Sequence, residues 1–472
     1  MNATDKKVPT ELGTQPIGQL LLKYALPAII AMTASSLLNN VDRFFISRFV
    51  GPDAISGLGA TMPFMNLGAA FGAMVGVGAS AVMSIRLGQR DYSTAQKVLG
   101  NTISLNVIIS LLVTAVCLLF LDPLLYLFGA SENTIQYARP YMLIILGGGI
   151  ITHNYLGLNS IIRSTGHPTF SMACTITTVL SNALLDWLFV WQMKTGIVGA
   201  AWATIIAQII GLCMEIAILS RKSELVHLTR GIYRISLKIV RQILVIGLSP
   251  FLLNACACLV VLLINQGMRR YGDASGIPDG GDCALGAYSI VNGVVFLFLM
   301  VVMGVNQGMQ PIVGYNWGAH QNARVWKTLR FAIFAATCIT TLGFLVGELC
   351  PELLTSLFSD GDSEKSQQIL AMSTRGFRID VMVLPLVGSQ MVIGNFFQSI
   401  GHAGKSIFMS LSRQLLFLVP GILILPHYYG LDGVWYAIPL SDALSVFCSF
   451  TLLYLLVRKV NKKDKESANK QE

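Results

Sequence analysis

Long apolar blocks separated by short polar loops dominate the chain. Blocks such as 25–38, 98–121, 201–219, 331–346 and 407–425 carry few charges. A helix needs roughly 17–25 apolar residues to cross the hydrocarbon core of a membrane, and the blocks are near or above that length. Ala, Gly, Leu and Ile dominate, and the alternation of a membrane β-barrel is missing. The pattern therefore predicts an all-α polytopic membrane protein.

The apolar pattern places twelve transmembrane helices along the chain. Their edges are set by polar and basic residues in the gaps. The predicted spans are 18–47, 55–83, 95–121, 135–161, 169–192, 197–219, 239–268, 284–314, 325–347, 376–399, 406–427 and 432–457. The first 16 residues are polar and the first span is too long for a cleavable signal peptide, so we expect the first helix to stay in the membrane.

The basic residues are distributed unevenly between the two sides of this topology. The side that holds both termini carries 24 of the 33 Lys and Arg. Cytoplasmic loops are enriched in Lys and Arg, so both termini are expected inside. The net charge of +9 then reflects topology and attraction to a lipid bilayer with anionic headgroups, and no nucleic-acid partner is expected.

Composition supports the membrane assignment and excludes several kinds of site. Only 12% of residues are charged, about half the share of a soluble domain. The nine Cys are scattered without a CxxC, which gives no zinc clip. Nucleotide-binding GxxxxGK[ST], HExxH and GxSxG motifs are missing. We therefore expect no enzyme and no cofactor, and any pumping must use an ion gradient or an external partner.

Three sequence matches between the two halves indicate an internal repeat. The segment 78–99 aligns with 308–329, RSTGHP at 163 with QSIGHA at 398, and GIVGAAWA at 196 with GLDGVWYA at 430. Both aligned 86–97 and 316–330 loops are basic, so the repeats are parallel. The predicted division is a cytoplasmic segment 1–17, an N-lobe bundle 18–219, a cytoplasmic linker 220–238 (a tether or an interfacial helix), a C-lobe bundle 239–457 and a basic tail 458–472, with a central cleft between the six-helix bundles.

Two carboxylates lie inside apolar spans of the first half. Asp186 follows Asn182 by four residues, on the same helical face, and Asp42 follows Asn39 by three. A charge at the middle of a membrane is costly, so such residues are candidate functional groups. The set suits one or two protons or a small hard cation. Alternatively, each carboxylate bonds to backbone or to a neighbouring helix, or Asp42 pairs with Arg43.

Other polar residues and prolines inside the spans have competing interpretations. Arg413 and Asp442 form an ion pair, a gate or a substrate contact, and Gln310 is a further candidate for gate or contact. Glu215 is expected at a solvated inner end, and His153 as a hydrogen-bonded core histidine. Pro27 and Pro250 kink their helices, either for packing or as a hinge for alternating access.

The chain resembles the MATE (multidrug and toxic compound extrusion) family, in its MepA-like and DinF-like bacterial branches. The resemblance rests on PIGQLLLKYALPAII, NNVD, RLGQRDYSTAQKVLG, RSTGHP, SNALLD, GAAWAT, MGVNQGMQPIVGYNWGA and FFQSIGHAGKS, and covers about 16–457. It implies a twelve-helix antiporter that exports cationic, amphipathic drugs in exchange for Na⁺ or H⁺.

The resemblance also implies a cation site in the first lobe and a hinge. The matching positions are Asp42, Asn182, Asp186, Thr204, Asn159, more loosely Tyr141, and Pro27 for the hinge. If the ion is Na⁺, Asp42, Asp186 and Asn182 are its expected ligands. Other branches carry acidic groups in spans seven, eight and ten. Here we expect none, with Asn265, Asn292, Gln307 and Gln390 in the aligned regions.

These expectations describe a monomeric multidrug efflux transporter of the bacterial cytoplasmic membrane. The alternative from another class is a flippase or exporter of a lipid-linked or metabolite substrate, which would favour a cationic cleft. A membrane enzyme or channel is a third interpretation, weakened by the missing motifs and by the repeat.

Overall fold

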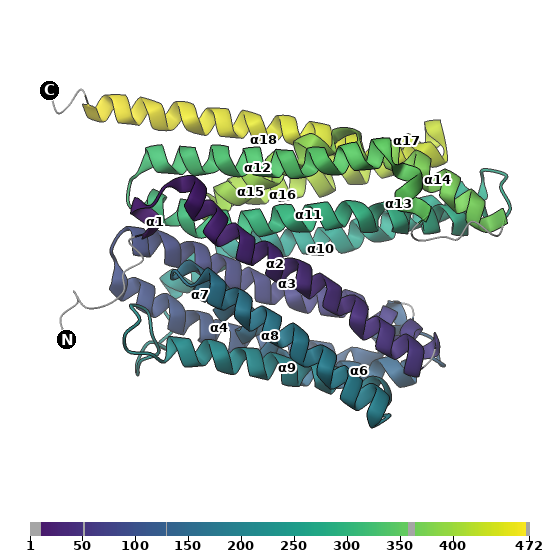
Figure 1. Cartoon of the computed structure of the whole chain (residues 1–472), viewed down its shortest axis with the longest axis horizontal. Coiled ribbons are helices and arrows are strands. Elements are labelled where there is room, and N and C mark those ends of the chain that lie inside the picture. The colour runs from purple at the N-terminus through teal and green to yellow at the C-terminus, as the bar shows by residue number, and fades with distance from the viewer. Residues whose placement is uncertain (1–10, 51, 129, 357–363, 469–472) are drawn as a thin grey trace. The chain divides into compact units, whose positions relative to one another are not determined.

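The computed structural model describes residues 11–468 except 51, 129 and 357–363. A few further side chains lie outside the described set, namely those at 37–40, 42–44, 47, 52–53, 55–56, 60, 353, 355–356, 461 and 463–468. Among the described residues, every regular element is a helix (Figure 1). This agrees with the predicted all-α class.

The first half of the chain forms nine α-helices and one π-helical segment within the described residues. In chain order these are α1 (Glu11–Thr14), α2 (Ile17–Phe49), α3 (Pro52–Gly88), α4 (Tyr92–Leu119), α5 (Leu121–Leu127), α6 (Ile135–Gly147), α7 (Gly149–Ser164), α8 (Pro168–Asp186), η2 (Trp187–Gln192) and α9 (Gly196–Leu219).

The second half is built in a similar way. Its described elements are α10 (Leu237–Asp273), α11 (Gly280–Gly318), α12 (Asn322–Leu349), α13 (Pro351–Ser356), α14 (Glu364–Asp380), η3 (Val381–Val383), α15 (Leu384–Ser399), α16 (Ala403–Leu411), η4 (Ser412–Leu418), α17 (Val419–Tyr429) and α18 (Leu431–Ala468).

The predicted transmembrane helices are confirmed by length and composition. Eleven helical segments of the described chain are long and apolar enough to cross a membrane. A twelfth span is the pair α6 and α7, which bend by 54° at Gly148. The predicted ranges agree with these spans to within five residues, with two exceptions. The span predicted at 376–399 begins earlier, in the helical segment Glu364–Ser399. The span predicted at 18–47 corresponds to the helix α2, of which Ile17–Ser36 meets the criteria of length and composition. The protein is therefore a multi-pass membrane protein.

The internal repeat is visible in the backbone as well as in the sequence. Left-handed conformations with positive φ recur at the loop positions that the sequence alignment pairs with each other. The pairs are Arg90 with His320, Gly166 with Gly401, and Gly196 with Gly430. Residues with positive φ are uncommon outside glycine, so the recurrence at Arg90 and His320 is informative. The two halves thus share turn geometry where the sequence matches.

Breaks in helical geometry also recur at equivalent spans. The fifth and eleventh spans each contain a π-helical segment, η2 and η4. The fourth span bends at Gly148, and the tenth is interrupted by the 3₁₀ turn η3. Single π turns inside α-helices are frequent at functional sites. Asp186 directly precedes η2, and Arg413 lies within η4.

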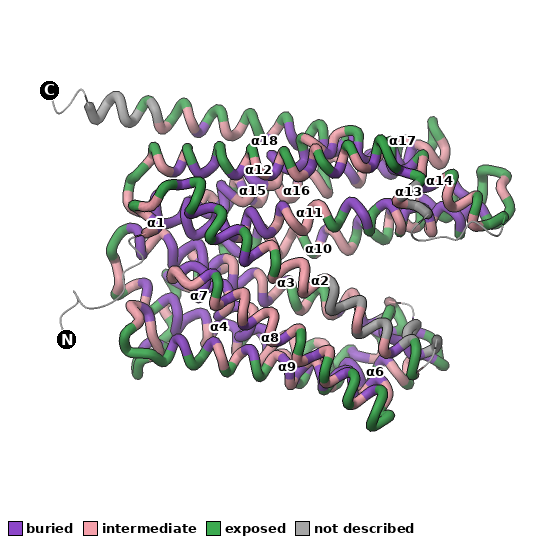
Figure 2. Tube along the Cα trace, in the orientation of Figure 1, coloured by how far each residue is buried: buried purple, intermediate pink, exposed green. Residues whose placement is uncertain are grey.

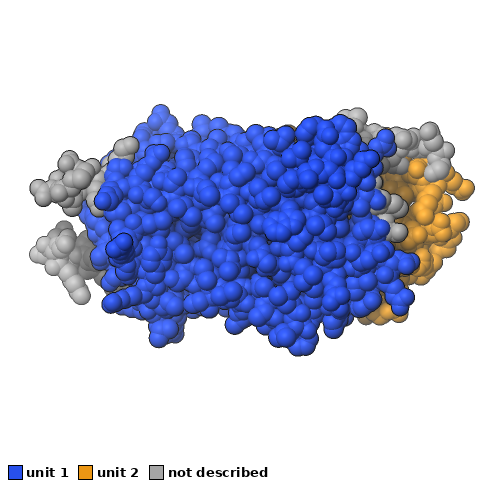
Figure 3. Space-filling view, turned by 90° about the horizontal axis from the view of Figure 1, so that it is seen from below, with its two compact units in different colours: residues 1–255, 307–328, 399–403 blue, residues 256–306, 329–398, 404–472 orange. Residues whose placement is uncertain are grey.

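The chain divides into two compact units (Figure 3). Unit 1 comprises Met1–Ala255, Gln307–Thr328 and Ser399–Ala403, and unit 2 comprises Cys256–Asn306, Leu329–Gln398 and Gly404–Glu472. Unit 1 therefore includes segments of the second sequence half. The lobe boundaries at 219 and 239 were derived from the sequence repeat, and they stay a prediction.

The linker between the halves contains no helix over 221–236, so the interfacial-helix alternative is wrong. It runs along α4 and is held there by side-chain hydrogen bonds. Asn101 Nδ2 donates to the Arg234 carbonyl at 3.2 Å, and the Ser236 amide donates to Asn101 Oδ1 at 2.7 Å. The segment is therefore a tether attached to the first half.

Within unit 1, α3 packs closely against parts of α10 and α11 through glycines. A Cβ atom built on Gly247 would lie 1.8 Å from the Met74 carbonyl oxygen, and one on Gly78 would lie 2.1 Å from the Ile243 carbonyl oxygen. A Cβ on Gly318 would lie 2.2 Å from the Ile85 carbonyl oxygen. Residues 78–84 are all buried (Figure 2). Small residues allow membrane helices to approach backbone to backbone, as here.

We expect Gly247→Val to separate α3 from α10 and to destabilise this arrangement. Overpacking a close contact costs about 1–3 kcal/mol. Thermal unfolding of the purified protein in detergent measures the loss as a lower Tm. The matched control is Gly293→Val, since a Cβ at this helical glycine meets no atom within 4 Å. Equal Tm values for the two variants would contradict the close contact.

Candidate functional site

A polar face runs along the whole of α8. Its buried residues after the first turn are Ser171, Cys174, Thr178, Asn182 and Asp186, spaced three or four apart. Residues at this spacing lie above one another on one side of a helix. The helix packs against α2, α7 and α9, which cover this side (Figure 1). The sequence thus places oxygen and sulfur groups at successive turns along one buried side of this helix.

Asp186 and Asn182 form the C-terminal end of this face. Both side chains are buried, with exposed fractions of 0% and 1%. Asn182 Nδ2 donates a hydrogen bond to Asp186 Oδ2 at 2.8 Å. The pairing predicted from the four-residue spacing is therefore present. Carboxylate and amide oxygens of this kind are ligands that hard cations bind.

Asp42 and Asn39, the predicted partners from the first span, lie in α2, but their side chains are outside the described residues. The helix that carries them does pack against α8 and η2. The shared acidic site therefore stays a prediction for Asp42.

Asn159 occupies a different position from the one that the resemblance implied. Its Nδ2 donates to Glu215 Oε1 at 2.9 Å and to the Ser171 carbonyl at 3.2 Å. Its Oδ1 accepts from Ser171 Oγ at 2.7 Å. Asn159 is thus grouped with Glu215 of α9 near the start of α8, whereas Asp186 is the last residue of that helix.

Glu215 is the residue that sequence reasoning misjudged. We expected a solvated side chain, but its exposed fraction is 0%. The reason lies one turn earlier at Gly211, where a Cβ would come within 2.3 Å of Thr178 Oγ1. The glycine lets α9 approach α8, and this approach encloses the face that carries Glu215. A glycine four residues before an acid was the available signal.

Each of the remaining first-half candidates has a partner within the protein. The Tyr141 hydroxyl lies 3.7 Å from Met65 Sδ and is buried, and the Thr204 hydroxyl donates to the Ala200 carbonyl at 3.1 Å. His153 is buried, with Nε2 at 3.0 Å from the Gly68 carbonyl oxygen. The prediction of a hydrogen-bonded core histidine is confirmed.

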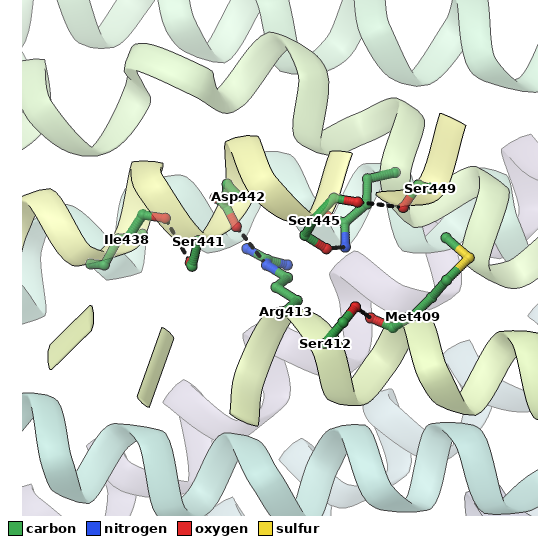
Figure 4. Close-up of polar contacts among 9 residues, drawn as sticks. Met409, Ser412, Arg413, Ile438, Ser441, Asp442, Ser445 and Ser449 are labelled. Atoms are coloured by element: carbon green, nitrogen blue, oxygen red, sulfur yellow. Dashed lines mark hydrogen bonds and ion pairs between the residues drawn. The ribbon is translucent and has the colours of Figure 1, made fainter. Parts of the chain in front are cut away.

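Arg413 and Asp442 form an ion pair inside unit 2. Arg413 Nε lies 2.7 Å from Asp442 Oδ1, with side-chain exposed fractions of 20% and 6% (Figure 4). The π turn of η4 carries the guanidinium toward α18. Nearby, Gln390 Nε2 donates to Ser445 Oγ at 2.6 Å. Of the alternatives left open by the sequence, the ion pair is confirmed, while a gating role stays a prediction.

The expectation that spans seven, eight and ten carry no acidic residue is wrong. Asp380 ends α14, in the tenth span, and lies within electrostatic range of Asp442 and Arg413. Comparing only the aligned position Gln390 overlooked it. Unit 2 therefore holds two acidic groups around one arginine.

Gln310 and Pro27 lie where helices of unit 1 pack together. Gln310 is buried, and its Nε2 donates to the Val77 carbonyl at 3.1 Å. The amide is thus committed to the backbone of α3. Pro27 is buried within the continuous helix α2, and a Cβ on Gly308 would lie 2.5 Å from the Ala25 amide nitrogen. The hinge role of Pro27 stays a prediction.

The described residues contain no cluster of three or more His, Cys, Asp or Glu side chains that could hold a metal ion. A cation at Asp186 would therefore be held by one or two carboxylates together with amide and hydroxyl oxygens, which are ligands of hard cations. Such a weak, mixed set suits an ion that must leave again.

Comparison with known proteins places this geometry in context. The family model described as MatE matches residues 27–188 and 275–423. The multidrug export protein MepA of Staphylococcus haemolyticus (strain JCSC1435) is 23% identical over 440 residues, which cover 93% of this chain and 94% of the relative. MepA of Staphylococcus aureus (strain MSSA476) is 22% identical over 441 residues, with the same coverage.

Two solved structures share the fold. One is reported as the outward-facing conformation of a multidrug resistance MATE family transporter of the MOP superfamily, with a TM-score of 0.88, 23% identity and coverage of 97% of this chain and 99% of that chain. The other is a MOP superfamily transporter from Pyrococcus furiosus, with the same TM-score, identity and coverage.

Proposed function

Because the chain belongs to the MatE family, we propose that it is a secondary active multidrug exporter. It carries cationic, amphipathic compounds out of the cell in exchange for Na⁺ or H⁺. The curated relatives that it matches along nearly its full length are multidrug export proteins. Its location is the cytoplasmic membrane of a bacterium, with both termini inside.

The observation that carries the proposal is the buried pair Asp186 and Asn182. Burying a carboxylate inside a membrane helix costs free energy, and Asp186 has an exposed fraction of 0%. Packing alone does not explain why a carboxylate is present there. Such a carboxylate is useful where a cation or a proton binds and leaves, because the bound ion neutralises its negative charge during part of the transport cycle. Export follows if ion binding and drug binding favour opposite-facing states.

This ligand set is compatible with either Na⁺ or H⁺ as the coupling ion. Asp and Asn oxygens suit a small hard cation, and a buried carboxylate equally suits a proton. Proteoliposomes with Na⁺ replaced by K⁺ at a fixed pH gradient separate the two. Efflux that persists without Na⁺ assigns the proton, and efflux that stops assigns Na⁺.

Expression in a bacterium that lacks its own drug pumps tests the exporter function. We expect raised tolerance to ethidium and to some fluoroquinolones, because these compounds are cationic or amphipathic. Minimum inhibitory concentrations are compared with an empty vector at matched membrane expression. Unchanged tolerance to all of these compounds would contradict multidrug export and favour a lipid-linked or metabolite substrate.

A further inference from the structure

Glu215 is a buried carboxyl group that the proposed exchange at Asp186 does not use. Its Oε1 accepts from Asn159 Nδ2 at 2.9 Å. Its Oε2 is buried and has no hydrogen-bond partner among the described residues. An unsatisfied buried polar atom is costly, so such an atom in a native protein calls for an explanation.

The groups around Glu215 do not supply a permanent counter-charge. The titratable side chains that face it are Tyr155 from α7 and Cys174 from α8. In the part of the chain that the structure describes, no Lys, Arg or His lies within ion-pair distance of it. A structural ion pair therefore does not account for this carboxyl group.

The polar face of α8 extends from the neighbourhood of Glu215 to Asp186. Ser171, which shares Asn159 with Glu215, lies fifteen residues before Asp186, or about 22 Å along a helix. Thr178 and Cys174 supply a hydroxyl and a thiol between these two ends. Groups of this kind can pass protons, together with water, because each can accept and donate.

A small cavity lies one helical turn beyond Glu215. Ile218 of α9 and Ile162 of α7 line it, and each follows a member of the Asn159–Glu215 pair by three residues. Its water-accessible volume of about 10 Å³ is close to the room that one water molecule needs. His167 and Glu224 also line it, with His167 Nε2 at 3.4 Å from Glu224 Oε2. Both are partly exposed.

We propose that Glu215 is a second proton-binding site, which exchanges a proton between the α8 face and the cavity beside His167 and Glu224. This inference rests on the proposed ion coupling at Asp186 and deepens it for the proton. A proton that leaves the Asp186 carboxyl group passes through water and the hydroxyl and thiol groups of the polar face, each of which accepts one proton as it gives up another, and it binds to the carboxylate at Glu215 Oε2. Glu215 then releases it to water in the cavity.

A proton fits this site better than Na⁺ does. A metal cation needs several oxygen ligands at once. Here Asn159 presents its NH₂ group to Glu215, and its own oxygen accepts from Ser171. One carboxylate oxygen is too small a set for a metal ion, whereas a single proton completes it.

Infrared difference spectra of the purified full chain between acid and alkaline pH test the proposal. We expect a protonated-carboxyl C=O band in the wild type that is lost in Glu215→Gln. The matched control is Glu348→Gln, because Glu348 is exposed at the end of α12. Asn159→Leu should shift the band without removing it, since it removes the amide donor to Oε1. This second variant keeps the test valid if Glu215→Gln folds poorly.

The outcomes separate this inference from the proposed function. An unchanged band in Glu215→Gln overturns the proton site, even if Asp186→Asn stops efflux. A wild-type band that shifts on adding Na⁺ at constant pH also overturns it, in favour of the metal ion. Loss of the band in Glu215→Gln together with normal efflux in Asp186→Asn supports the site and contradicts the coupling at Asp186.

Discussion

Asp186→Asn will abolish ion-driven efflux while the protein still inserts in the membrane. The substitution keeps the shape of the side chain and its ability to bond with Asn182, but it removes the charge that binds the ion. Without a charge, loading and unloading of the ion no longer bias the two facing states. Ethidium efflux from proteoliposomes under an imposed Na⁺ or pH gradient measures the effect.

The control for this experiment is Asp122→Asn. Asp122 has a side-chain exposed fraction of 43% and pairs with Arg139 at 3.2 Å, so its substitution removes a partly exposed carboxylate outside the predicted ion site. We expect efflux at the wild-type rate for this variant. Efflux by Asp186→Asn equal to that of the control would reduce Asp186 to a structural role, and the proposed ion coupling would fail with it.

Arg413→Leu will produce the largest loss of stability. It leaves Asp442, with a side-chain exposed fraction of 6%, without its partner at 2.7 Å. Removing one member of a buried ion pair costs about 3–5 kcal/mol, whereas replacing both by apolar residues is often neutral. The double variant Arg413→Leu, Asp442→Leu should therefore regain most of the stability. Thermal unfolding of both variants in the same detergent gives the comparison.

Transport by the double variant distinguishes the interpretations of this pair. A double variant that is stable and transports ethidium means that the pair only holds unit 2 together. A stable double variant without transport means that the charges act as a gate or contact the substrate. A double variant as unstable as the single one contradicts the reciprocal pairing, and it would point to Asp380 as an equal partner of Arg413.

The transmembrane helices and the repeat could be predicted from the sequence because both depend on local properties. The length of an apolar block decides whether it crosses the membrane, and GIVGAAWA and GLDGVWYA carry the same turn glycine in both halves. The pairing of Asn182 with Asp186 was predictable for the same reason, since two residues that are four positions apart on one helix are neighbours on its surface.

The surroundings of Glu215 and Asn159 could not be predicted, because they depend on which helices meet. Glu215 lies four residues from the end of α9, where solvent exposure is the usual result. Burial came from the approach of α8 at Gly211. The glycine itself is visible in the sequence, but the sequence does not show which helix approaches it. Asp380 itself is visible in the sequence of the tenth span, but its grouping with Asp442 and Arg413 could not be predicted, because these two residues come from other helices.

The glycine contacts of α3 bear on how quickly and in what manner the molecule changes shape. In these contacts the backbone carbonyl groups of one helix lie directly against glycines of another. Because no flexible side chain lies between the helices to adjust, the contact is either fully formed or fully broken. Recordings of single molecules labelled across these helices should therefore show abrupt jumps between long dwells. A smooth drift through half-separated positions is not expected.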